Sequence, residues 1–442
     1  MLILTEMTQK PWSIRRRTFL AMVGASTAIA GCSSVTPWRS DRHHPTERPT
    51  MNPEKVYRIS KNYHVGPERK RPPASDAEGT IWEVVDTEST AIRRTLSDGE
   101  RWFTLNVEAG PPSATGEYHL TSEDGFEEIQ RVIDRTDGNV VIRLAPGTYV
   151  GSELTLDHGV ILAGSGRNAT TLKLEDGANT DLLTTPNPPT ENVMECTLRD
   201  ITFDGNKANN RKGNVVYGAF WNSRFVDCEF HSAPESGFWL AGSEASTDDN
   251  QFRGCQFIDN RGTGLRGGAN KVSYPAVGVA RVDTNWFGHN GGPAITARGN
   301  SWKISDSKFY DNALTGGATI ELDRCSYSSV TNSDIYSARA DRDLIAVSAS
   351  TGVNSIGNQV KNNDLRGEYR SAVRCLADGN GVLALQVHGN TFQSGGDARS
   401  GIVAREERGS FAHCSFKDNT FVGVFTGAKV TLLPGWQRAA NV

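Results

Sequence analysis

A pattern of apolar and polar positions recurs along residues 198–421 at intervals of 22–30 residues. Each copy is built around an apolar anchor, and a second apolar residue lies five positions before that anchor. Such a period is typical of a solenoid, and the copies lack the 3.6-residue periodicity of helices. The nine anchors are Phe203, Phe230, Phe257, Phe287, Phe309, Ile335, Leu365, Phe392 and Phe421.

Within each copy, the residue three before the anchor predicts a sharp bend between two short strands. It is Asp, Asn or Gly in eight copies and Thr284 in the ninth. Asp, Asn and Gly tolerate the left-handed backbone conformation of such bends. The residue two before the anchor shares its strand face and is mostly small or an amide, so we expect a buried ladder there.

A third strand follows a small residue between one anchor and the next, as in Ser236-Gly237-Phe238 and Ser400-Gly401-Ile402. Three strands per repeat, stacked about 4.8 Å apart, predict a parallel β-helix. The predicted fold class is therefore all-β: a single-stranded, right-handed parallel β-helix of roughly 10–12 coils. An amphipathic helix at Phe126, Ile129 and Ile133 is expected to cap its N-terminal end.

These repeats resemble the pectate-lyase-like β-helix superfamily. The entry segment resembles it too, through the helix at residues 126–133 and the strand at 140–144, followed by Pro146-Gly147-Thr148-Tyr149. The resemblance covers roughly residues 120–433 and implies a polysaccharide ligand and a substrate groove on the outer face of the third strands. Neither the polygalacturonase motifs nor the aspartate cluster of calcium-dependent pectate lyases is found.

The N-terminus resembles an export signal. Arg16-Arg17 precedes an apolar run, Leu20–Ala30, that is too short to span a bilayer, and residues 1–31 are similar to a Tat-type signal peptide. The run ends in a lipobox-like sequence, which implies a lipid on Cys32; an ordinary N-terminal anchor or an uncleaved Tat signal is the alternative. We expect an exported protein, either on the outer face of the cell membrane as a lipoprotein or secreted.

Four further ranges complete the expected domain organisation. Residues 32–79 are polar, lack periodicity and predict a disordered tether. Residues 80–120 contain two strand-like runs that are expected to pack on the β-helix. The β-helix itself is expected at 121–433, with a C-terminal tail at 434–442.

Charge and cysteine content narrow the classes of partner. The formal net charge is −4, so composition indicates no nucleic-acid partner. Six cysteines lie beyond Cys32, and Cys228, Cys255 and Cys375 fall on inward positions. We expect buried thiols rather than a disulfide framework.

The outward positions of the third strands hold the candidate site. Glu321 and Asp323 stand at i and i+2, about 6.5–7 Å apart at Cα, with Arg298 on the preceding coil. That spacing suits the paired carboxyl groups of an inverting glycosidase. Arginine suits acidic sugars and an aromatic side chain suits a sugar ring, so the expected substrate-binding residues are Trp239, Arg266, Arg374 and Arg405.

Two other interpretations of these charges stay open. Arg298 and Asp323 could form a plain surface ladder of opposite charges, and the carboxylates could bind Ca²⁺. Asp341 and Asp343 are expected in a loop that could also bind calcium or be solvated. No metal site is assigned.

Two function classes follow. The first is a lipid-anchored enzyme, a lyase or hydrolase acting on an acidic polysaccharide. The second is a non-catalytic β-helix that binds glycan or serves as a cell-surface structural or adhesion module. Fold alone does not decide between them, and the oligomeric state is left open.

Overall fold

The computed structural model describes the strand residues 57–60, 63–66, 81–84, 93–97 and 102–105, Pro73, and residues 116–136, 139–242, 247–268, 277–396, 398–407, 409–432 and 436–439. The expected signal peptide at 1–31, with Cys32, lies outside the described residues. Within them, no helix is long and apolar enough to cross a membrane.

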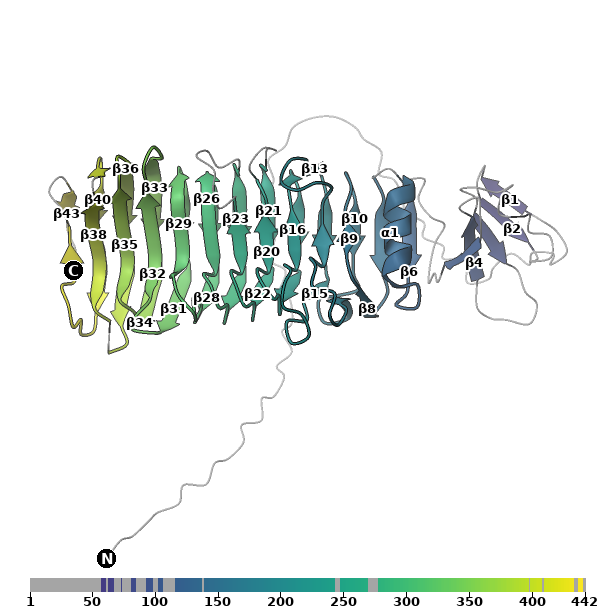
Figure 1. Ribbon diagram of the computed structural model, residues 1–442, viewed down its shortest axis with the longest axis horizontal. Helices are drawn as coiled ribbons and strands as arrows, with labels where there is room; N and C mark the ends of the chain where they lie inside the picture. Colours follow the sequence, from purple (N-terminus) through teal and green to yellow (C-terminus); the bar gives the residue numbers. More distant parts are fainter. Residues whose placement is uncertain are drawn as a thin grey trace, which may run out of the picture. The chain divides into compact units, whose positions relative to one another are not determined.

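A right-handed parallel β-helix of about 11 turns forms the body of the protein, as predicted (Figure 1). Sheet 1, with 14 strands, collects the first strand of each turn. Its strands are β6 Glu117–Leu120, β7 Val141–Leu144, β10 Ile161–Ala163, β14 Thr197–Arg199, β18 Arg224–Val226, β21 Asn250–Arg253, β24 Ala280–Asp283, β27 Trp302–Ser305, β30 Ser329–Thr331, β33 Ser355–Lys361, β36 Val382–His388, β39 Ser410–Phe411, β40 Ser415–Lys417 and β43 Gln437–Ala439.

Sheets 2 and 3 have 11 strands each and collect the second and third strands of the turns. Sheet 2 contains β8 Gly147–Gly151, β11 Thr170–Leu174, β15 Thr202–Asp204, β19 Glu229–His231, β22 Gln256–Ile258, β25 Trp286–Gly288, β28 Lys308–Tyr310, β31 Asp334–Ala338, β34 Asp364–Glu368, β37 Thr391–Ser394 and β41 Thr420–Val422. Sheet 3 contains β9 Leu154–Thr155, β12 Leu183–Thr184, β16 Val216–Gly218, β20 Phe238–Leu240, β23 Leu265–Gly267, β26 Ile295–Asn300, β29 Ala318–Ser326, β32 Asp343–Ala349, β35 Ser371–Asp378, β38 Ser400–Glu407 and β42 Val430–Thr431.

The nine anchors form one column in register inside the β-helix. Every successive pair of anchors from Phe203 to Phe421 is a direct partner across neighbouring strands of sheet 2. The phenylalanine rings stack face to face, for example 5.1 Å apart between Phe230 and Phe257. The apolar residues five before the anchors form a second column in sheet 1.

A buried amide and hydroxyl ladder runs beside the anchor column, as the sequence predicts. The backbone N–H of Ser333 donates to Asn363 Oδ1 at 3.0 Å, and that of Asn363 donates to Asn390 Oδ1 at 3.0 Å. Such bonds satisfy backbone groups at the bend, where the sheets cannot. The six described cysteines are buried and free, which confirms the expectation of thiols.

The bend residue has a positive φ in all nine repeats, including Thr284 at +56°. A β-branched residue is strained there, whereas asparagine is tolerated, as at Asn332 with φ +51°. We expect Thr284→Asn to raise the free energy of unfolding by about 1 kcal/mol, and Asn332→Thr to lower it by a similar amount. Urea unfolding of both variants checks this; equal shifts in one direction would contradict the strain argument.

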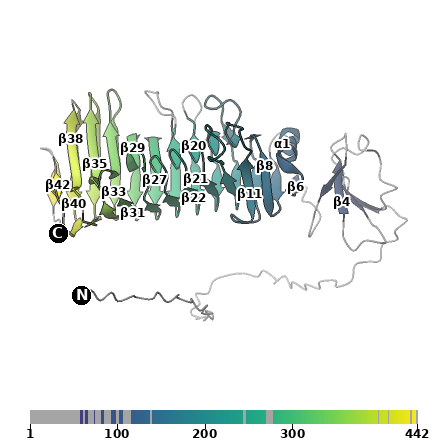
Figure 2. The same cartoon turned by 60° about the horizontal axis from the view of Figure 1, so that its bottom comes forward.

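Helix α1, Gly125–Thr136, precedes β7 and lies at the end of the stack formed by β6 and β8 (Figures 1 and 2). The amide and hydroxyl of Thr121 donate to Asp124 Oδ2 at 2.6 and 2.9 Å just before the helix. Phe126, Ile129 and Ile133 are buried, in agreement with the amphipathic pattern. The capping role of this helix stays a prediction.

Five further strands form a separate sheet in the order β1-β2-β3-β4-β5. They are β1 Tyr57–Ser60, β2 Tyr63–Gly66, β3 Ile81–Val84, β4 Arg93–Ser97 and β5 Trp102–Leu105. The two strand-like runs expected in residues 80–120 correspond to β3 and β5. The range expected to be an irregular tether, residues 32–79, contains β1 and β2, because β2 pairs in parallel with β3. The packing expected of residues 80–120 stays a prediction.

Candidate functional site

The outer face of sheet 3 brings four of the predicted site residues, Trp239, Arg266, Glu321 and Arg374, into one column. Trp239 pairs with Arg266, and two strands further along the stack Glu321 follows Thr296. Arg374 lies two strands beyond Glu321. At about 4.8 Å per strand, the column from Trp239 to Arg374 spans roughly 24 Å. The predicted register is therefore confirmed, while the roles of these residues stay predictions.

A second outward column lies two residues further along each strand. It places Asp323, Ser348 and Arg405 in register, with Leu376 between the last two. Arg298 departs from this register because β26 and β29 are irregularly paired between Ala297 and Gly299. The irregularity also gives Arg324 a positive φ of +56° and brings it beside Asp323.

Three side chains donate hydrogen bonds to Asp323, and one of them, Arg324, donates two, since its Nε lies 3.3 Å from Oδ1. Arg298 Nε donates to Oδ2 at 2.7 Å, Arg324 Nη2 to the same oxygen at 3.1 Å, and Ser348 Oγ to Oδ1 at 2.9 Å. Burial alone would raise the pKa of Asp323, but the hydrogen bond from Arg324 and the charge of Arg298 outweigh it and lower the pKa. Asp323 is therefore the carboxylate that stays ionised.

Glu321, two residues away, has the opposite environment. Burial raises its pKa, and the nearby Asp323 charge adds to that effect. Its hydrogen bonds are long: the Ala318 amide donates to Oε1 and Thr296 Oγ1 to Oε2, both at 3.3 Å. Two neighbouring carboxyl groups with pKa values shifted apart are the arrangement that separates an acid from a base.

Trp239 and Arg266 form one end of the face. The Arg266 guanidinium lies 4.0 Å from the centre of the Trp239 ring, and burial together with the nearby Arg298 charge lowers the pKa of Arg266. Both side chains line a cavity of about 380 Å³ with Glu235 and Arg261. An aromatic surface and a desolvated cation thus share one recess.

Four arginines surround a cavity of about 270 Å³ at the other end of the face: Arg370, Arg374, Arg399 and Arg405. The fully buried Asp343 accepts hydrogen bonds from Arg370 Nε at 3.0 Å and Nη2 at 2.5 Å, and Arg374 Nε lies 2.7 Å from its Oδ2. One carboxylate therefore orients two guanidinium groups, and the cavity wall keeps an excess of positive charge.

The expectation for Asp343 was wrong. This residue opens β32 and is fully buried, where it pairs with Arg370 and Arg374, so it is neither in a solvated loop nor available to calcium. Its position two residues before the inward Ile345 was the signal, since side chains two apart share a strand face. Sequence reasoning also missed Arg324, Arg370 and Arg399 as parts of the site.

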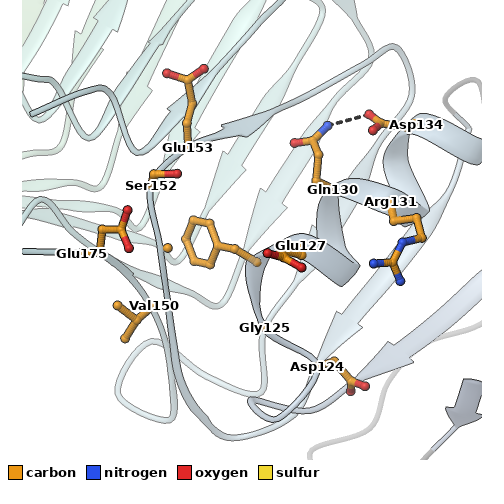
Figure 3. Close-up of a pocket in the computed structure, with 12 residues that line it drawn as sticks. Asp124, Gly125, Glu127, Gln130, Arg131, Asp134, Val150, Ser152, Glu153 and Glu175 are labelled. Carbon is orange, nitrogen blue, oxygen red and sulfur yellow. Dashed lines mark hydrogen bonds between the residues drawn. The ribbon is translucent and has the colours of Figure 1, made fainter. Parts of the chain in front are cut away.

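A larger cavity, of about 760 Å³, lies between α1 and the end of β8 with the residues that follow it (Figure 3). Asp124, Glu127, Glu153 and Glu175 lie around it, and Gln130 Nε2 donates to Asp134 Oδ1 at 2.7 Å on the helix. This acidic lining repels an acidic glycan. In the part of the chain that the structure describes, no three His, Cys, Asp or Glu residues are grouped so that they could hold a metal ion.

Comparisons with known proteins agree with the architecture. Residues 223–432 match the family described as "Right handed beta helix region". The A-module of the mannuronan C-5 epimerase AlgE4 from Azotobacter vinelandii superposes with a TM-score of 0.53 and 18% identity, over 73% of this chain and 99% of that one. The AlgE6 A-module from the same organism gives a TM-score of 0.50 at 20% identity, over 73% and 98% of the two chains.

At these identities the likeness concerns the fold alone. Residues 223–432 are similar to that family, in agreement with the parallel β-helix that the structure has there. No curated protein matches the chain.

Proposed function

We propose that this protein binds an acidic polysaccharide along the outer face of sheet 3 and hydrolyses it there. The observation that carries the proposal is the cavity lined by four arginines, two of which pair with the buried Asp343, at the same outer face as Glu321 and Asp323. Planar guanidinium groups match the carboxylates of uronic acids. At the other end, Trp239 and Arg266, which stack on each other at 4.0 Å, line a recess that a sugar residue could enter.

The two carboxyl groups suit hydrolysis with inversion. Glu321 has the raised pKa of a general acid and gives its proton to the glycosidic oxygen as the bond from that oxygen to the anomeric carbon breaks. A water adds to the anomeric carbon from the opposite side and transfers a proton to Asp323. Arg298 and Arg324 hold Asp323 in place.

A uronic-acid polymer is the first substrate class to test, and the AlgE4 and AlgE6 modules, named as mannuronan epimerases, support that choice. The full chain is offered mannuronan and polygalacturonate. New reducing ends would support hydrolysis, whereas absorbance from unsaturated products would indicate a lyase instead. Binding without any product would favour the second candidate function.

That second candidate is a non-catalytic glycan-binding β-helix at the cell surface. It is favoured by one observation: the Asp323 carboxylate is already hydrogen-bonded by Arg298, Arg324 and Ser348, as in a structural charge ladder. A binder needs the arginines and Trp239 but not the titration of Glu321.

Binding should depend on the arginine cavity. We expect the double variant Arg399→Gln/Arg405→Gln to weaken binding of a hexamannuronate by at least about 100-fold, since each of the two lost charge-assisted hydrogen bonds contributes roughly 1.5–3 kcal/mol. The matched control is Arg253→Gln/Arg281→Gln, two exposed arginines in sheet 1. Calorimetry measures the affinity of both double variants. Equal losses of affinity would show that the arginines act only through general charge attraction.

Export and lipid attachment belong to the same proposal. Arg16-Arg17 and the lipobox-like residues up to Cys32 support a Tat-exported lipoprotein that carries the β-helix on the outer face of the membrane. Mass spectrometry of the mature N-terminus decides this: a diacylglycerol-modified Cys32 is expected, and an unmodified Cys32 in the exported protein would refute lipidation.

A further inference from the structure

Sheet 2 carries an aromatic surface that the site on sheet 3 does not use. Trp286, on β25, and Tyr310, on β28, are 42% and 47% exposed. Tyr336, on β31, stacks on Tyr310 with ring centres 5.0 Å apart and planes 13° apart. Exposed aromatic side chains that cluster on neighbouring strands indicate a binding surface, whereas single scattered ones do not.

These side chains flank a groove of about 600 Å³. One side is the outward column of Trp286, Lys308 and Asp334, which are in register on β25, β28 and β31. The other side is the column of Tyr310, Tyr336 and Arg366. The buried Phe309 lies between the columns and forms the floor.

The width of the groove limits its occupant. The two columns are two residues apart on the same strands, about 6.5–7 Å at Cα. An α-helix, about 10–12 Å across, cannot enter. An extended peptide could not pair its backbone, because β28 and β31 are already hydrogen-bonded to strands on both sides.

The polar groups of the groove suit hydroxyl groups rather than an ion. Arg366 Nε donates to Asp334 Oδ1 at 2.8 Å, and a second contact joins Arg366 Nη2 to Asp334 Oδ2. This pair is electrically balanced and lies beside Lys308 and the aromatic rings. Apolar surface with a few placed donors and acceptors is typical of a small-ligand site, and a sugar ring offers both C–H faces and hydroxyls.

We propose that this aromatic groove, formed by Trp286, Lys308, Asp334, Tyr310, Tyr336 and Arg366, is a second glycan-binding site that takes an extended, uncharged oligosaccharide. The strand spacing of about 4.8 Å is close to the length of one pyranose residue in an extended chain, so successive rings can meet successive rungs. The same turns that supply the groove from β25, β28, β31 and β34 continue into β26, β29, β32 and β35, which carry the site on sheet 3. Because both sites lie on the same turns, a glycan bound in the aromatic groove would be held close to the arginine cavity.

The full chain is titrated with a β-1,4-linked glucose hexasaccharide by calorimetry, with tryptophan fluorescence as a second readout. We expect Trp286→Ala and Tyr310→Ala each to weaken binding by about 3–10-fold. The matched controls are Trp221→Ala, 42% exposed, and Tyr327→Ala, 57% exposed, which lie outside the groove and should bind as the wild type does.

Three results would overturn the inference. One is absence of binding by the wild type, and another is equal binding by the groove variants and their controls. The third is a change in sedimentation of the groove variants without any change in sugar binding, which would make the surface a contact between copies of this chain. The Arg399→Gln/Arg405→Gln variant should keep its affinity for the neutral hexasaccharide, so failure of the acidic site and failure of the groove are distinguishable.

Discussion

Replacing Phe257 by alanine is expected to lower the free energy of unfolding by about 3–5 kcal/mol. The Phe257 ring is fully buried and stacks between Phe230 at 5.1 Å and Phe287 at 4.7 Å. Removing it leaves a cavity with aromatic rings above and below, which the rigid strand spacing prevents from closing. Urea unfolding followed by circular dichroism measures the loss.

Phe421→Ala is the matched control, because it makes the same change in the same column near the C-terminal end of the stack. Phe421 stacks on Phe392 at 5.0 Å and is only partly buried. In a solenoid each turn is stabilised mainly by its neighbours, so the loss there should be clearly smaller. Equal losses at Phe257 and Phe421 would contradict a continuous core in which central rungs contribute most.

The inner columns of the β-helix could be predicted from the sequence because two local rules determine them. Side chains alternate along a strand, and the bend requires a left-handed residue three positions before each anchor. Thr284 tests the second rule, since its position in the repeat predicted a bend that its residue type does not favour, and its φ is +56°. The position of Thr284 in the repeat therefore determines its backbone conformation, against the conformational preference of threonine.

Side-chain partners on the outer face were less predictable. The register of Glu321, Asp323 and Arg374 follows from counting residues along the strands. The irregular pairing between β26 and β29 does not follow from counting, and it decides that Arg324 as well as Arg298 contacts Asp323. Such a bulge depends on how two specific strands fit together, so it cannot be predicted from the periodic pattern of the sequence.

The arginine cavity depends on a buried charge that the hydrophobic pattern gives no reason to expect. Asp343 occupies an inward position where the neighbouring strands place Ala318 and Ser371. A carboxylate is tolerated there because Arg370 and Arg374 pair with it. Arg370 and Arg374 lie 27 and 31 positions after Asp343 in the sequence, so the contacts form only because successive turns stack.

Glu321→Gln is expected to reduce the release of reducing ends from mannuronan by about 10²–10⁴-fold, which is the usual contribution of a general acid. Glutamine keeps the shape of the side chain and its acceptor oxygen but carries no transferable proton. Glu229→Gln, on the outer face of sheet 2, is the matched control and should leave the rate unchanged.

The pH dependence separates a catalytic from a structural role for Glu321. Burial raises the folded-state pKa of Glu321, so its favourable contribution to stability is present below its ordinary pKa and is lost as pH rises through the raised value. Since the glutamine variant stays uncharged, it should be at least as stable as the wild type at neutral pH. Activity of the wild type should fall over the same rise in pH, because the acid loses its proton. A variant that is equally stable and still releases reducing ends at the wild-type rate would rule out Glu321 as the acid and leave the glycan-binding role of the arginines standing alone.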